Sequence, residues 1–522
     1  MKYLLTASQM KAADHYTIEK LGIPSLVLME RASLACARYL YSLDRVLSPI
    51  LILCGSGNNG GDGFALARIL SERKEEVIIC FTGRETSLTP ECRTQKEICE
   101  NLHIKMLSWN DLRSGQYENY FSVIVDAMLG IGLSRELKES YKEIIDWANS
   151  RNALRFALDI PSGVHADDGR IMGTAFMADH TVTFQYLKRG QLLYPGTSCC
   201  QKLICENIGI FEEGLKKQNP ELMLLEKNDL QDLLPRKADS HKGSYGKLLL
   251  IAGSEGMSGA ACMAALSALR SGCGMVRVLT CESNRIILQS LIPEAMISTY
   301  VPERLTIEFP DKMLTELLSW ADVIAAGPGL GMSDASRMLV EAILSQAYCK
   351  KKDMPLLLDA DALNLISACK MDFLAYEGPI VLTPHVGELK RLLDSFAGNE
   401  ISGNIVETTQ IFAAKLNEIK KLKCSNRFHP LILVRKDSRT LISDGKAIYM
   451  NTFGNSGMAT AGSGDVLAGL ISSLLAQHNE PLKASALGVL IHALAGDEAA
   501  ARHGQAGMIA TDMVMEFGHI MS

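Results

Sequence analysis

The sequence predicts two α/β domains in one chain, each a three-layer α/β/α arrangement with a mostly parallel sheet between two layers of helices. Short apolar runs alternate with stretches of helical spacing, which is the pattern of a parallel sheet wrapped by helices. Most of these runs end in loops rich in glycine, aspartate or serine, and the alternation is interrupted once, near residue 225. We therefore expect one α/β domain on each side of that interruption.

The composition is that of an ordinary globular protein. At roughly 150 residues per domain, a chain of 522 residues has room for two or three domains. With 47% hydrophobic residues, 21% charged residues and a net charge of −6, the chain offers no long-range attraction to nucleic acid or to anionic lipid. We expect neither as a partner, and we expect a homo-oligomer.

The first 20 residues lack the apolar core of a signal peptide, and no stretch reaches the roughly 18 uninterrupted apolar residues of a membrane span. The 14 cysteines are spread through the chain, several of them in apolar segments, and only Cys199 and Cys200 lie close together. This distribution signals neither a disulfide framework nor a zinc site. We expect a cytoplasmic protein with reduced cysteines that serve packing.

In the N-terminal half, residues 7–42 have helical spacing and precede the first strand. Three polar loops then follow strands: GSGNNGGDG at 55–63, DAMLGIGLSRE at 126–136 and DIPSGVHADDG at 159–169. Because open α/β sheets bind ligands beyond the carboxyl ends of their strands, we expect these loops to meet in one crevice. The expected strands are 50–54, 76–81, 122–126, 154–159 and 181–184.

The glycine loop at 55–63 satisfies G-x-G-x-x-G, the fingerprint of a loop that carries a dinucleotide pyrophosphate. A standard NAD site also needs an acidic residue about 20 positions later, to hold the ribose hydroxyls. That position reads CFTGR, with Arg84 and no acid, so a standard NAD-holding Rossmann site is not favoured. A glycine turn that serves only helix packing stays open as an alternative.

Polar side chains of the three loops suit a cation and a proton transfer. Asn59, Asp126 and Ser162 offer an amide oxygen, a carboxylate and a hydroxyl, which are hard ligands for an alkali or alkaline-earth cation. Asp159 at a strand end can exchange a proton with a bound substrate, although aspartate is also common there as a cap or turn residue.

Together with LMERA at 28–32, these loops resemble the NAD(P)H-hydrate epimerase domain, over roughly residues 1–215. The resemblance implies a Rossmann-like fold in which a damaged dinucleotide is the substrate, Asp159 is catalytic, and Asn59, Asp126 and Ser162 hold potassium. It implies substrate contacts from Asn58, Asn59, Gly60, Gly61, Asp62, Gly130, Ile131, Gly132, Leu133, Ser134, Arg135, Glu136 and Asp159.

Residues 211–240 are more charged, carry two prolines and break the alternation. We place the domain boundary near 225, with domains at 1–225 and 226–522. The two halves share no motif order, so the chain is a fusion and not a tandem repeat. The second series of strands and following loops is KLLLIAGS at 247–254, MVRVLT at 275–280, VIAAGPGLG at 323–331, PLLLDADALN at 355–364, PIVLTPHVGE at 379–388 and LILVRKD at 431–437.

The segment NSGMATAGSGDVLAGLISSLLA at 455–476 is a glycine turn that runs directly into a helical pattern. Backbone N–H groups at such a helix start form an anion pocket, and Asp465 stands where a carboxylate can take a proton from a hydroxyl. Aspartate is also favoured in the first turn of any helix. The segment predicts phosphoryl-transfer chemistry without a Walker lysine.

Several other segments of the second half resemble the ribokinase-like fold: 253–278, AAGPGLG at 325–331, DADALN at 359–364, TPHVGE at 383–388 and VRKDSRT at 434–440. HKGSYG at 241–246 and HALAGDEAA at 492–500 narrow the resemblance to the ADP- or ATP-dependent NAD(P)H-hydrate dehydratases, over about residues 235–515.

This second resemblance implies that a base, Asp465, promotes phosphorylation of the hydroxyl of the hydrate, and that loss of phosphate then restores the nicotinamide ring. Phosphate is a good leaving group and hydroxide is a poor one. Mg²⁺ would accompany the ADP or ATP. The resemblance implies that Ala260, Gly329, His385 and Asp465 contact the hydrate, and that Lys436, Asp437, Ser438, Arg439, Thr440 and Gly464 line the nucleotide.

The sequence leaves open the roles of two of these residues, His385 and Asp437. His385, before V-G-E after a strand, is as often a hydrogen-bonding loop residue as a ligand. The dehydratase family usually has Lys-Gly where this chain has Lys436-Asp437. Glycine would permit a positive φ and close approach, whereas aspartate adds a charge near phosphates. We expect a changed nucleotide affinity or preference, without loss of activity.

The main hypothesis is a bifunctional metabolite-repair enzyme that epimerises the R and S forms of hydrated NADH or NADPH and dehydrates the S form with ADP or ATP. One alternative is a small-molecule kinase of the ribokinase-like fold with an accessory nucleotide-binding N-terminal domain. A second is that the N-terminal domain is a binding or scaffold module. Asp126, Asp159 and the full NNGGD loop argue against a scaffold, which has no need for a cation site.

Overall fold

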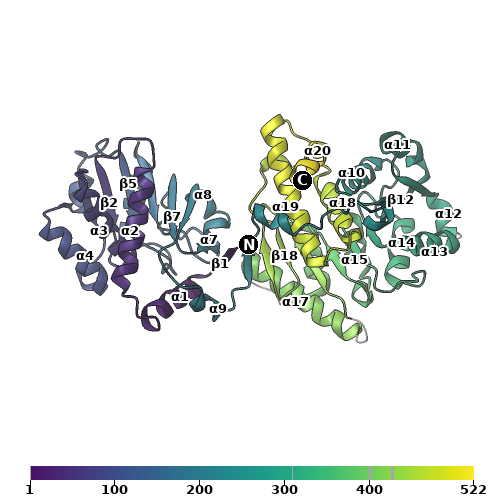
Figure 1. The fold of residues 1–522 in the computed structure, drawn as a ribbon, viewed down its shortest axis with the longest axis horizontal. Coiled ribbons are helices and arrows are strands. Elements are labelled where there is room, and N and C mark those ends of the chain that lie inside the picture. Colours follow the sequence, from purple (N-terminus) through teal and green to yellow (C-terminus); the bar gives the residue numbers. More distant parts are fainter. Residues whose placement is uncertain (1, 308–309, 399–402, 425–427) are drawn as a thin grey trace. The chain divides into compact units, whose positions relative to one another are not determined.

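In the computed structural model, the chain divides into two compact units, Tyr3–Pro220 and Glu221–Ser522, each visible as a separate α/β unit in Figure 1. The structure describes residues 2–307, 310–398, 403–424 and 428–522. The boundary predicted near residue 225 lies just beyond this division. Strand β10 (Leu222–Leu224) pairs with β19 (Ile448–Met450) and is therefore part of the C-terminal unit.

The N-terminal unit is built on a seven-stranded sheet with the order β4-β3-β2-β5-β6-β7-β9. Every pair of neighbours in this sheet is parallel. A separate short parallel pair joins β1 (Lys2–Leu5) to β8 (Leu187–Lys188). The sheet strands are β2 (Ile50–Cys54), β3 (Val77–Phe81), β4 (Lys105–Leu107), β5 (Val123–Ala127), β6 (Leu154–Leu158), β7 (His180–Phe184) and β9 (Lys202–Glu206).

Helices cover both faces of this sheet because alternate residues of each strand point to opposite faces. In β2, Ile50 and Ile52 pack in one apolar cluster with residues of α1 to α4, whereas Leu51 and Leu53 pack in another with residues of α5 and α6. The helical stretch predicted at 7–42 is two helices, broken where Gly22 takes φ +76° before Pro24. The helices are α1 (Ala7–Glu19), α2 (Ser25–Tyr41), α3 (Asn58–Glu72), η1 (Glu85–Ser87), α4 (Pro90–Asn101), α5 (Trp109–Leu112), α6 (Glu139–Asn149), α7 (Arg189–Leu192), α8 (Thr197–Cys200) and α9 (Glu212–Lys216).

The C-terminal unit has a longer mixed sheet with the order β13-β12-β11-β14-β15-β16-β17-β18-β19-β10. It is parallel from β13 to β17, and β18 is antiparallel to both of its neighbours. The strands are β11 (Lys247–Ile251), β12 (Met275–Cys281), β13 (Met296–Tyr300), β14 (Val323–Ala326), β15 (Leu356–Leu358), β16 (Ile380–Leu382), β17 (Leu431–Arg435) and β18 (Leu441–Ser443).

Two helical layers again enclose the sheet. Leu248 and Leu250 of β11 pack with residues of α10, α18, α19 and α20, and Leu249 and Ile251 pack with residues of α13 to α17. Figure 1 shows both layers beside the sheet. The three-layer α/β/α prediction is confirmed for both units. The helices are η2 (Lys227–Asp232), η3 (Lys242–Tyr245), α10 (Ser258–Arg270), η4 (Glu282–Asn284), α11 (Arg285–Leu291), α12 (Pro302–Ile307), α13 (Asp311–Trp320), α14 (Asp334–Ser345), α15 (Ala360–Cys369), η5 (Phe373–Ala375), α16 (Val386–Phe396), α17 (Ile405–Lys423), η7 (Ser456–Met458), α18 (Ser463–Ala476), α19 (Pro481–His503) and α20 (Ala510–Ile520).

Each sheet has one point where the strand order reverses. The chain goes from β2 outward to β3 and β4 and returns to the other side of β2 as β5; likewise it goes from β11 to β12 and β13 and returns as β14. Ligands of open α/β sheets bind at such switch points, beyond the carboxyl ends of the strands. The topology therefore places one candidate site between the β2 and β5 loops and another between the β11 and β14 loops.

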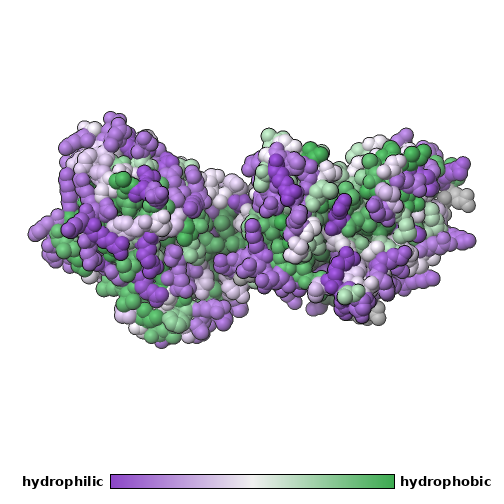
Figure 2. Space-filling model, turned by 45° about the horizontal axis from the view of Figure 1, so that its top comes forward, coloured by the Kyte–Doolittle hydropathy of each residue, from purple (hydrophilic) through white to green (hydrophobic). Residues whose placement is uncertain are grey.

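None of the 14 cysteines, all of which lie in the described residues, forms a disulfide. Eleven of them are buried, and these serve as small packing residues. Figure 2 shows hydrophilic side chains over much of the visible face, with hydrophobic side chains gathered in separate patches. No helix among the described residues is long and apolar enough to cross a membrane.

Candidate active sites

A cavity of about 670 Å³ lies at the switch point of the N-terminal unit. It is lined by α1 and α2, by the glycine loop with the start of α3, and by the loop that follows β5. The crevice predicted for these loops is therefore present. Among the predicted substrate contacts, the lining includes Asn58, Asn59, Asp62, Gly130, Ile131, Gly132, Leu133, Ser134, Arg135 and Asp159.

Gly60, Gly61 and Glu136 are not among the residues that line this cavity. A Cβ atom at Gly60 would lie 2.0 Å from the Gly55 carbonyl oxygen, and one at Gly61 would lie 2.5 Å from Cε of Met29. These two glycines therefore let α3 pack closely against the loop and against α2, which is the packing alternative raised by the sequence. Glu136 is exposed.

Asp159 follows β6 in a backbone conformation that is uncommon for a residue with a side chain, with φ +60°. Its N–H donates to the Val182 carbonyl of β7 and its own carbonyl accepts from Gln191 Nε2 of α7 at 2.6 Å, so a neighbouring strand and a helix hold this strained position. All the hydrogen bonds that the described residues give to its carboxylate end on Oδ1. Oδ2 is left available to a ligand in the cavity.

Lys188 is the ion-pair partner of Asp159. It could not be predicted from the sequence, because no motif surrounds it. Its side chain is completely buried, and Nζ donates to Asp159 Oδ1 at 2.5 Å, to Thr183 Oγ1 at 2.8 Å and to the Phe184 carbonyl at 3.2 Å. Lys188 also lines the cavity. A buried charge is tolerable only when it is paired and hydrogen-bonded, so the lysine and Asp159 depend on each other.

The three predicted cation ligands come together below the cavity. Ser162 donates from Oγ to Asp126 Oδ1 at 2.7 Å and from its N–H to Oδ2 at 2.6 Å, and Asn59 Nδ2 donates to the Leu129 carbonyl at 3.2 Å. Asp126 is fully buried, and burial raises its pKa to about 6 although hydrogen bonds from Ser162 and Met128 oppose the rise. Asn59 Oδ1 is buried without a hydrogen-bond donor among the described residues. An unsatisfied amide oxygen beside a buried carboxylate fits a small cation.

The C-terminal candidate site lies at the start of α18. Gly462 precedes the helix with φ +89°, and a Cβ atom there would lie 2.2 Å from Sδ of Met263, so only glycine fits. Asp465 lies in the first turn of α18. Burial, together with the charge of Asp359, raises the pKa of Asp465 to about 6. A carboxylate with this pKa can accept a proton near neutral pH.

Lys436 supplies a positive charge at this turn. Its Nζ donates to Asp359 Oδ1 at 2.7 Å and lies 3.3 Å from the position that a Cβ atom would take at Gly464. Burial disfavours the charged form of the lysine, but the negative charges of Asp359 and Glu388 have the larger effect together and raise the pKa of Lys436. The sequence indicated no Walker lysine, and the fold brings Lys436, which follows β17, to the start of α18.

Ala260 and Gly329 also meet at this switch point. Ser254 N–H donates to the Gly329 carbonyl at 2.6 Å, and a Cβ atom at Gly329 would lie 2.8 Å from the Ala260 Cβ. His385 caps α16: its Nδ1 accepts from the N–H groups of Gly387 at 2.9 Å and Glu388 at 3.4 Å. The hydrogen-bonding role that the sequence left open for His385 is therefore present, and its side chain is 56% exposed.

The motif HALAGDEAA supports the glycine turn from α19. Asp497 Oδ2 accepts from Gly454 N–H at 2.9 Å and its Oδ1 accepts from Asn455 Nδ2 at 3.0 Å. His492 lies under the turn, with Nε2 3.4 Å from Ser463 Oγ, and burial lowers its pKa to about 4. The histidine is therefore neutral beside the positive end of α18, and α19 holds the anion pocket in place.

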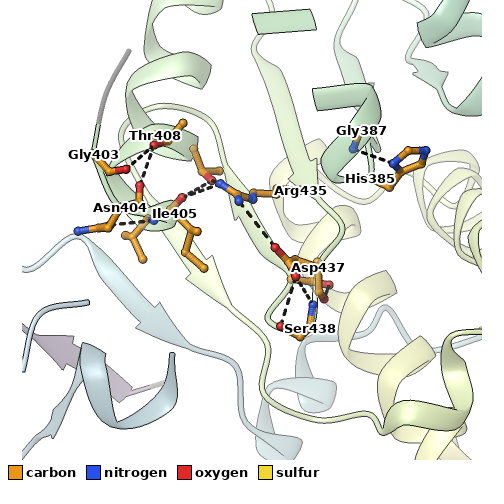
Figure 3. A network of polar contacts seen from close by, with 12 residues as sticks. His385, Gly387, Gly403, Asn404, Ile405, Thr408, Arg435, Asp437 and Ser438 are labelled. Carbon is orange, nitrogen blue, oxygen red and sulfur yellow. Dashed lines mark hydrogen bonds and ion pairs between the residues drawn. The ribbon is translucent and has the colours of Figure 1, made fainter. Parts of the chain in front are cut away.

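Asp437 stands where the dehydratase pattern has glycine, and its carboxylate contacts neighbouring residues of the same segment. Its Oδ1 accepts from Ser438 N–H at 2.7 Å and its Oδ2 lies 3.7 Å from Arg435 Nη2. Figure 3 shows Arg435 between Asp437 on one side and Ile405 at the start of α17 on the other. Position 437 does not have a positive φ, so the conformational freedom of glycine is not needed there. The expected extra charge is balanced by the guanidinium of Arg435.

Two α/β units, each with a carboxylate at the switch point of its sheet, define an enzyme with two separate sites. The family model for NAD(P)H-hydrate dehydratase matches residues 248–517, and that for the YjeF-related protein N-terminus matches residues 25–190. The bifunctional NAD(P)H-hydrate repair enzyme Nnr of Moorella thermoacetica is 36% identical over 98% of this chain and 95% of its own length. The enzyme of the same name from Escherichia coli is 33% identical over 99% of this chain and 93% of its own length.

Among solved structures, the ADP/ATP-dependent NAD(P)H-hydrate dehydratase of Bacillus subtilis, co-crystallized with ATP and Mg²⁺, is 29% identical, with a TM-score of 0.46, and covers 56% of this chain and 96% of its own. The full-length relatives and the two family models carry the assignment. The chain belongs to the family of bifunctional NAD(P)H-hydrate repair enzymes. The family predicted from the sequence is confirmed.

Proposed function

We propose that the N-terminal unit interconverts the R and S epimers of hydrated NADH or NADPH, and that the C-terminal unit dehydrates the S epimer with ADP or ATP as phosphoryl donor. The main support for this proposal is the full-length match to bifunctional repair enzymes. In agreement with it, each sheet has an acidic residue at its switch point. The fusion is chemically sensible, since a dehydratase for one epimer leaves the other unused until it is converted.

In the N-terminal cavity, Asp159 would exchange a proton with the hydrate through its free Oδ2, while Lys188 holds the carboxylate by Oδ1. The loop from Gly130 to Arg135 would hold the rest of the dinucleotide. Gly60, Gly61 and Glu136 stay predicted contacts. In this arrangement the glycine loop serves a substrate and not a resident cofactor.

Potassium would be held by Asn59, Asp126 and Ser162. The unsatisfied Asn59 Oδ1 and the buried Asp126 carboxylate support this assignment. When bound, the cation supplies positive charge that offsets the buried carboxylate. It would also fix the Leu129 segment that both Asn59 and Ser162 contact, and this segment leads into the substrate loop.

We expect potassium to stabilise the N-terminal unit. At a K⁺ concentration tenfold above its Kd, binding to the folded state alone adds about 1.4 kcal/mol to the free energy of unfolding. Thermal unfolding in KCl, compared with an equal concentration of a larger organic cation, measures the shift. Asp126→Asn should abolish the shift and Asp44→Asn, which changes an exposed carboxylate of the same unit, should keep it. An equal shift in the Asp126 variant would contradict the potassium assignment.

In the C-terminal site, Asp465 would take the proton of the hydrate's hydroxyl as that oxygen attacks the terminal phosphorus of ADP or ATP. The bond between that phosphorus and the departing AMP or ADP breaks. The new phosphate ester then loses phosphate, the adjacent ring carbon gives up a proton, and the ring double bond returns. The N–H groups at the start of α18 and the Lys436 ammonium would hold the phosphates. Ala260, Gly329 and His385 are proposed to contact the hydrate, and the segment from Lys436 to Thr440 with Gly464 to line the nucleotide.

Magnesium would arrive with the nucleotide. Mg²⁺ in such sites is held mainly by phosphates and water, with one or two carboxylates. Among the described residues no group of three or more His, Cys, Asp or Glu side chains could hold a metal by itself, which fits a cation that the nucleotide brings. Asp361, which interacts electrostatically with Asp465, is the carboxylate that would help to hold it. When bound, Mg²⁺ supplies charge that neutralises the phosphates.

We expect the Arg435–Asp437 pair to protect nucleotide affinity. Arg435→Met should weaken ADP binding about tenfold, because an unpaired carboxylate would remain beside the nucleotide segment. In an Asp437→Gly background the same arginine substitution should change the affinity less than twofold. Calorimetric titration of ADP into the four proteins gives the coupling, and thermal unfolding checks the loss of the Arg435 contact to Ile405. Equal effects in both backgrounds would contradict the pairing role.

A homo-oligomer and a cytoplasmic location stay predictions. Support for self-association comes from α11, where Ile286 is 77%, Ile287 44% and Leu291 61% exposed. Burying such side chains against a second copy would remove apolar area from water. Cysteines that form no disulfide among the described residues fit a reducing compartment.

One assay tests the function. Hydrated NADH is incubated with the protein, with and without ADP or ATP and with and without potassium, while the return of nicotinamide absorbance is followed. We expect recovery of both epimers only with a nucleotide. Release of a stable phosphorylated product without recovery of absorbance would instead favour the small-molecule kinase.

A further inference from the structure

The N-terminal cavity contains a second acid that the assignment of Asp159 does not use. Its charged lining side chains are Lys11, Asp14, Asp62, Arg135, Asp159 and Lys188. Asp159 is ion-paired with Lys188, but the Asp62 carboxylate receives no hydrogen bond and no ion pair from the part of the chain that the structure describes. Asp62 is only 9% exposed. A nearly buried carboxyl group without a partner is costly as an anion and acceptable as a neutral acid.

Asp62 is held in place by the packing of two helices. It lies in the second turn of α3, and Ser33 Oγ of α2 is 2.9 Å from its carbonyl oxygen. Burial, with repulsion from Asp159 and Asp14, raises the pKa of Asp62 well above its usual value. The cavity thus presents to the same ligand an ion-paired carboxylate and a carboxyl group whose neutral form is favoured by its surroundings. Two carboxyl groups in such different environments are a common arrangement for paired acid and base roles.

The chemistry of the hydrate needs two such groups. Water added across the double bond next to the ring nitrogen places the hydroxyl on the carbon bonded to that nitrogen, because the nitrogen lone pair stabilises positive charge there. The product is a hemiaminal. Its carbon can invert when the ring opens: a base removes the hydroxyl proton, the oxygen forms a carbonyl, and the carbon–nitrogen bond breaks with its electron pair going to nitrogen, which takes a proton from an acid.

We propose that Asp62 is this second catalytic residue: it protonates the ring nitrogen while Asp159 takes the hydroxyl proton through Oδ2. Rotation about the adjacent carbon–carbon bond turns the other face of the aldehyde toward nitrogen. Ring closure then runs the same steps in reverse, with Asp159 returning its proton to oxygen and Asp62 recovering its proton from nitrogen. No oxidant, reductant or other reactant is consumed. This assignment rests on the proposed epimerase function.

The test uses the full chain and one purified epimer without nucleotide, with the approach to the epimer mixture followed by chromatography. Asp62→Asn should lower kcat about a hundredfold and leave KM within about threefold, because it removes the acid and keeps the shape. Asp62→Glu restores a carboxyl group and should recover part of the lost rate. Asp44→Asn is the comparison, since Asp44 is an exposed carboxylate of the same unit outside the cavity lining, and it should lose less than threefold.

Thermal unfolding of the same variants, with a transition of the N-terminal unit near the wild-type temperature, shows that the unit that carries Asp62 is folded. A kcat within fivefold of wild type in Asp62→Asn, a rise in KM alone, or an equal loss in Asp44→Asn would overturn the role of Asp62 while the epimerase function stands. A wild-type chain that fails to interconvert the epimers would instead remove the proposed function, and this assignment with it.

Discussion

Replacing Asp465 by asparagine should lower the nucleotide-dependent recovery of NADH from its hydrate by a factor of roughly a thousand, as expected for loss of a catalytic base. The variant should keep epimer exchange. Asparagine retains the size and the polar contacts of the side chain but cannot accept the hydroxyl proton. Because the pKa of Asp465 is raised to about 6, the base is protonated below that pH, so the wild-type rate should fall as pH is lowered through about 6.

A matched variant separates this role from helix capping. Asp334 occupies the first turn of α14, as Asp465 occupies the first turn of α18, but its side chain is 80% exposed and pairs with Arg337. If Asp465 served only the helix dipole, both asparagine variants would lose a few tenths of a kcal/mol to about 1 kcal/mol of stability and neither would lose activity. We expect full recovery activity in Asp334→Asn. Recovery within tenfold of wild type in Asp465→Asn would refute its role as base.

Replacing Asp159 by asparagine should abolish epimer exchange and leave the dehydration of purified S epimer intact. The structure adds a consequence for stability, since the substitution removes the counter-ion of the fully buried Lys188. Breaking such a pair destabilises a protein by about 3–5 kcal/mol. Asp159→Asn alone is therefore an ambiguous test, because the N-terminal unit could lose both its proton acceptor and its packing.

The double variant Asp159→Asn with Lys188→Met resolves this ambiguity. Methionine fills most of the lysine volume without a charge, so much of the lost stability should return. We expect the double variant to unfold near the wild-type temperature and still to lack epimerase activity. Chromatography of the epimers and thermal unfolding measure the two effects separately. Restored activity in the double variant would show that Asp159 only neutralises Lys188.

These two sets of variants also test the independence of the sites. Each carboxylate lies in its own α/β unit, at its own switch point. Loss of both reactions in either folded single-site variant would contradict the assignment of separate active sites.

Much of the fold was predictable because central strands of parallel sheets are apolar on both faces. The expected strands at 50–54 and 76–81 correspond to β2 and β3. Edge strands such as β4, β9 and β13 were not predicted. Most of their residues are exposed or half-buried. An edge strand is covered less completely than a central one, so it needs no continuous apolar run.

The sequence by itself determined the residues whose chemistry is local. Gly462 and Asp465 could be predicted from a single segment. Asn59, Asp126 and Ser162 could be predicted from the loops at strand ends, because the carboxyl ends of parallel strands lie at one edge of the sheet. Only the tertiary structure decided the partners that come from distant segments: Lys188 beside Asp159, and Asp359 beside Lys436. Their contribution depends on burial and on distances below 3 Å, which arise from packing between elements and leave no periodic trace in the chain. For the same reason, the effect of Asp437 could be judged only once Arg435 was found beside it.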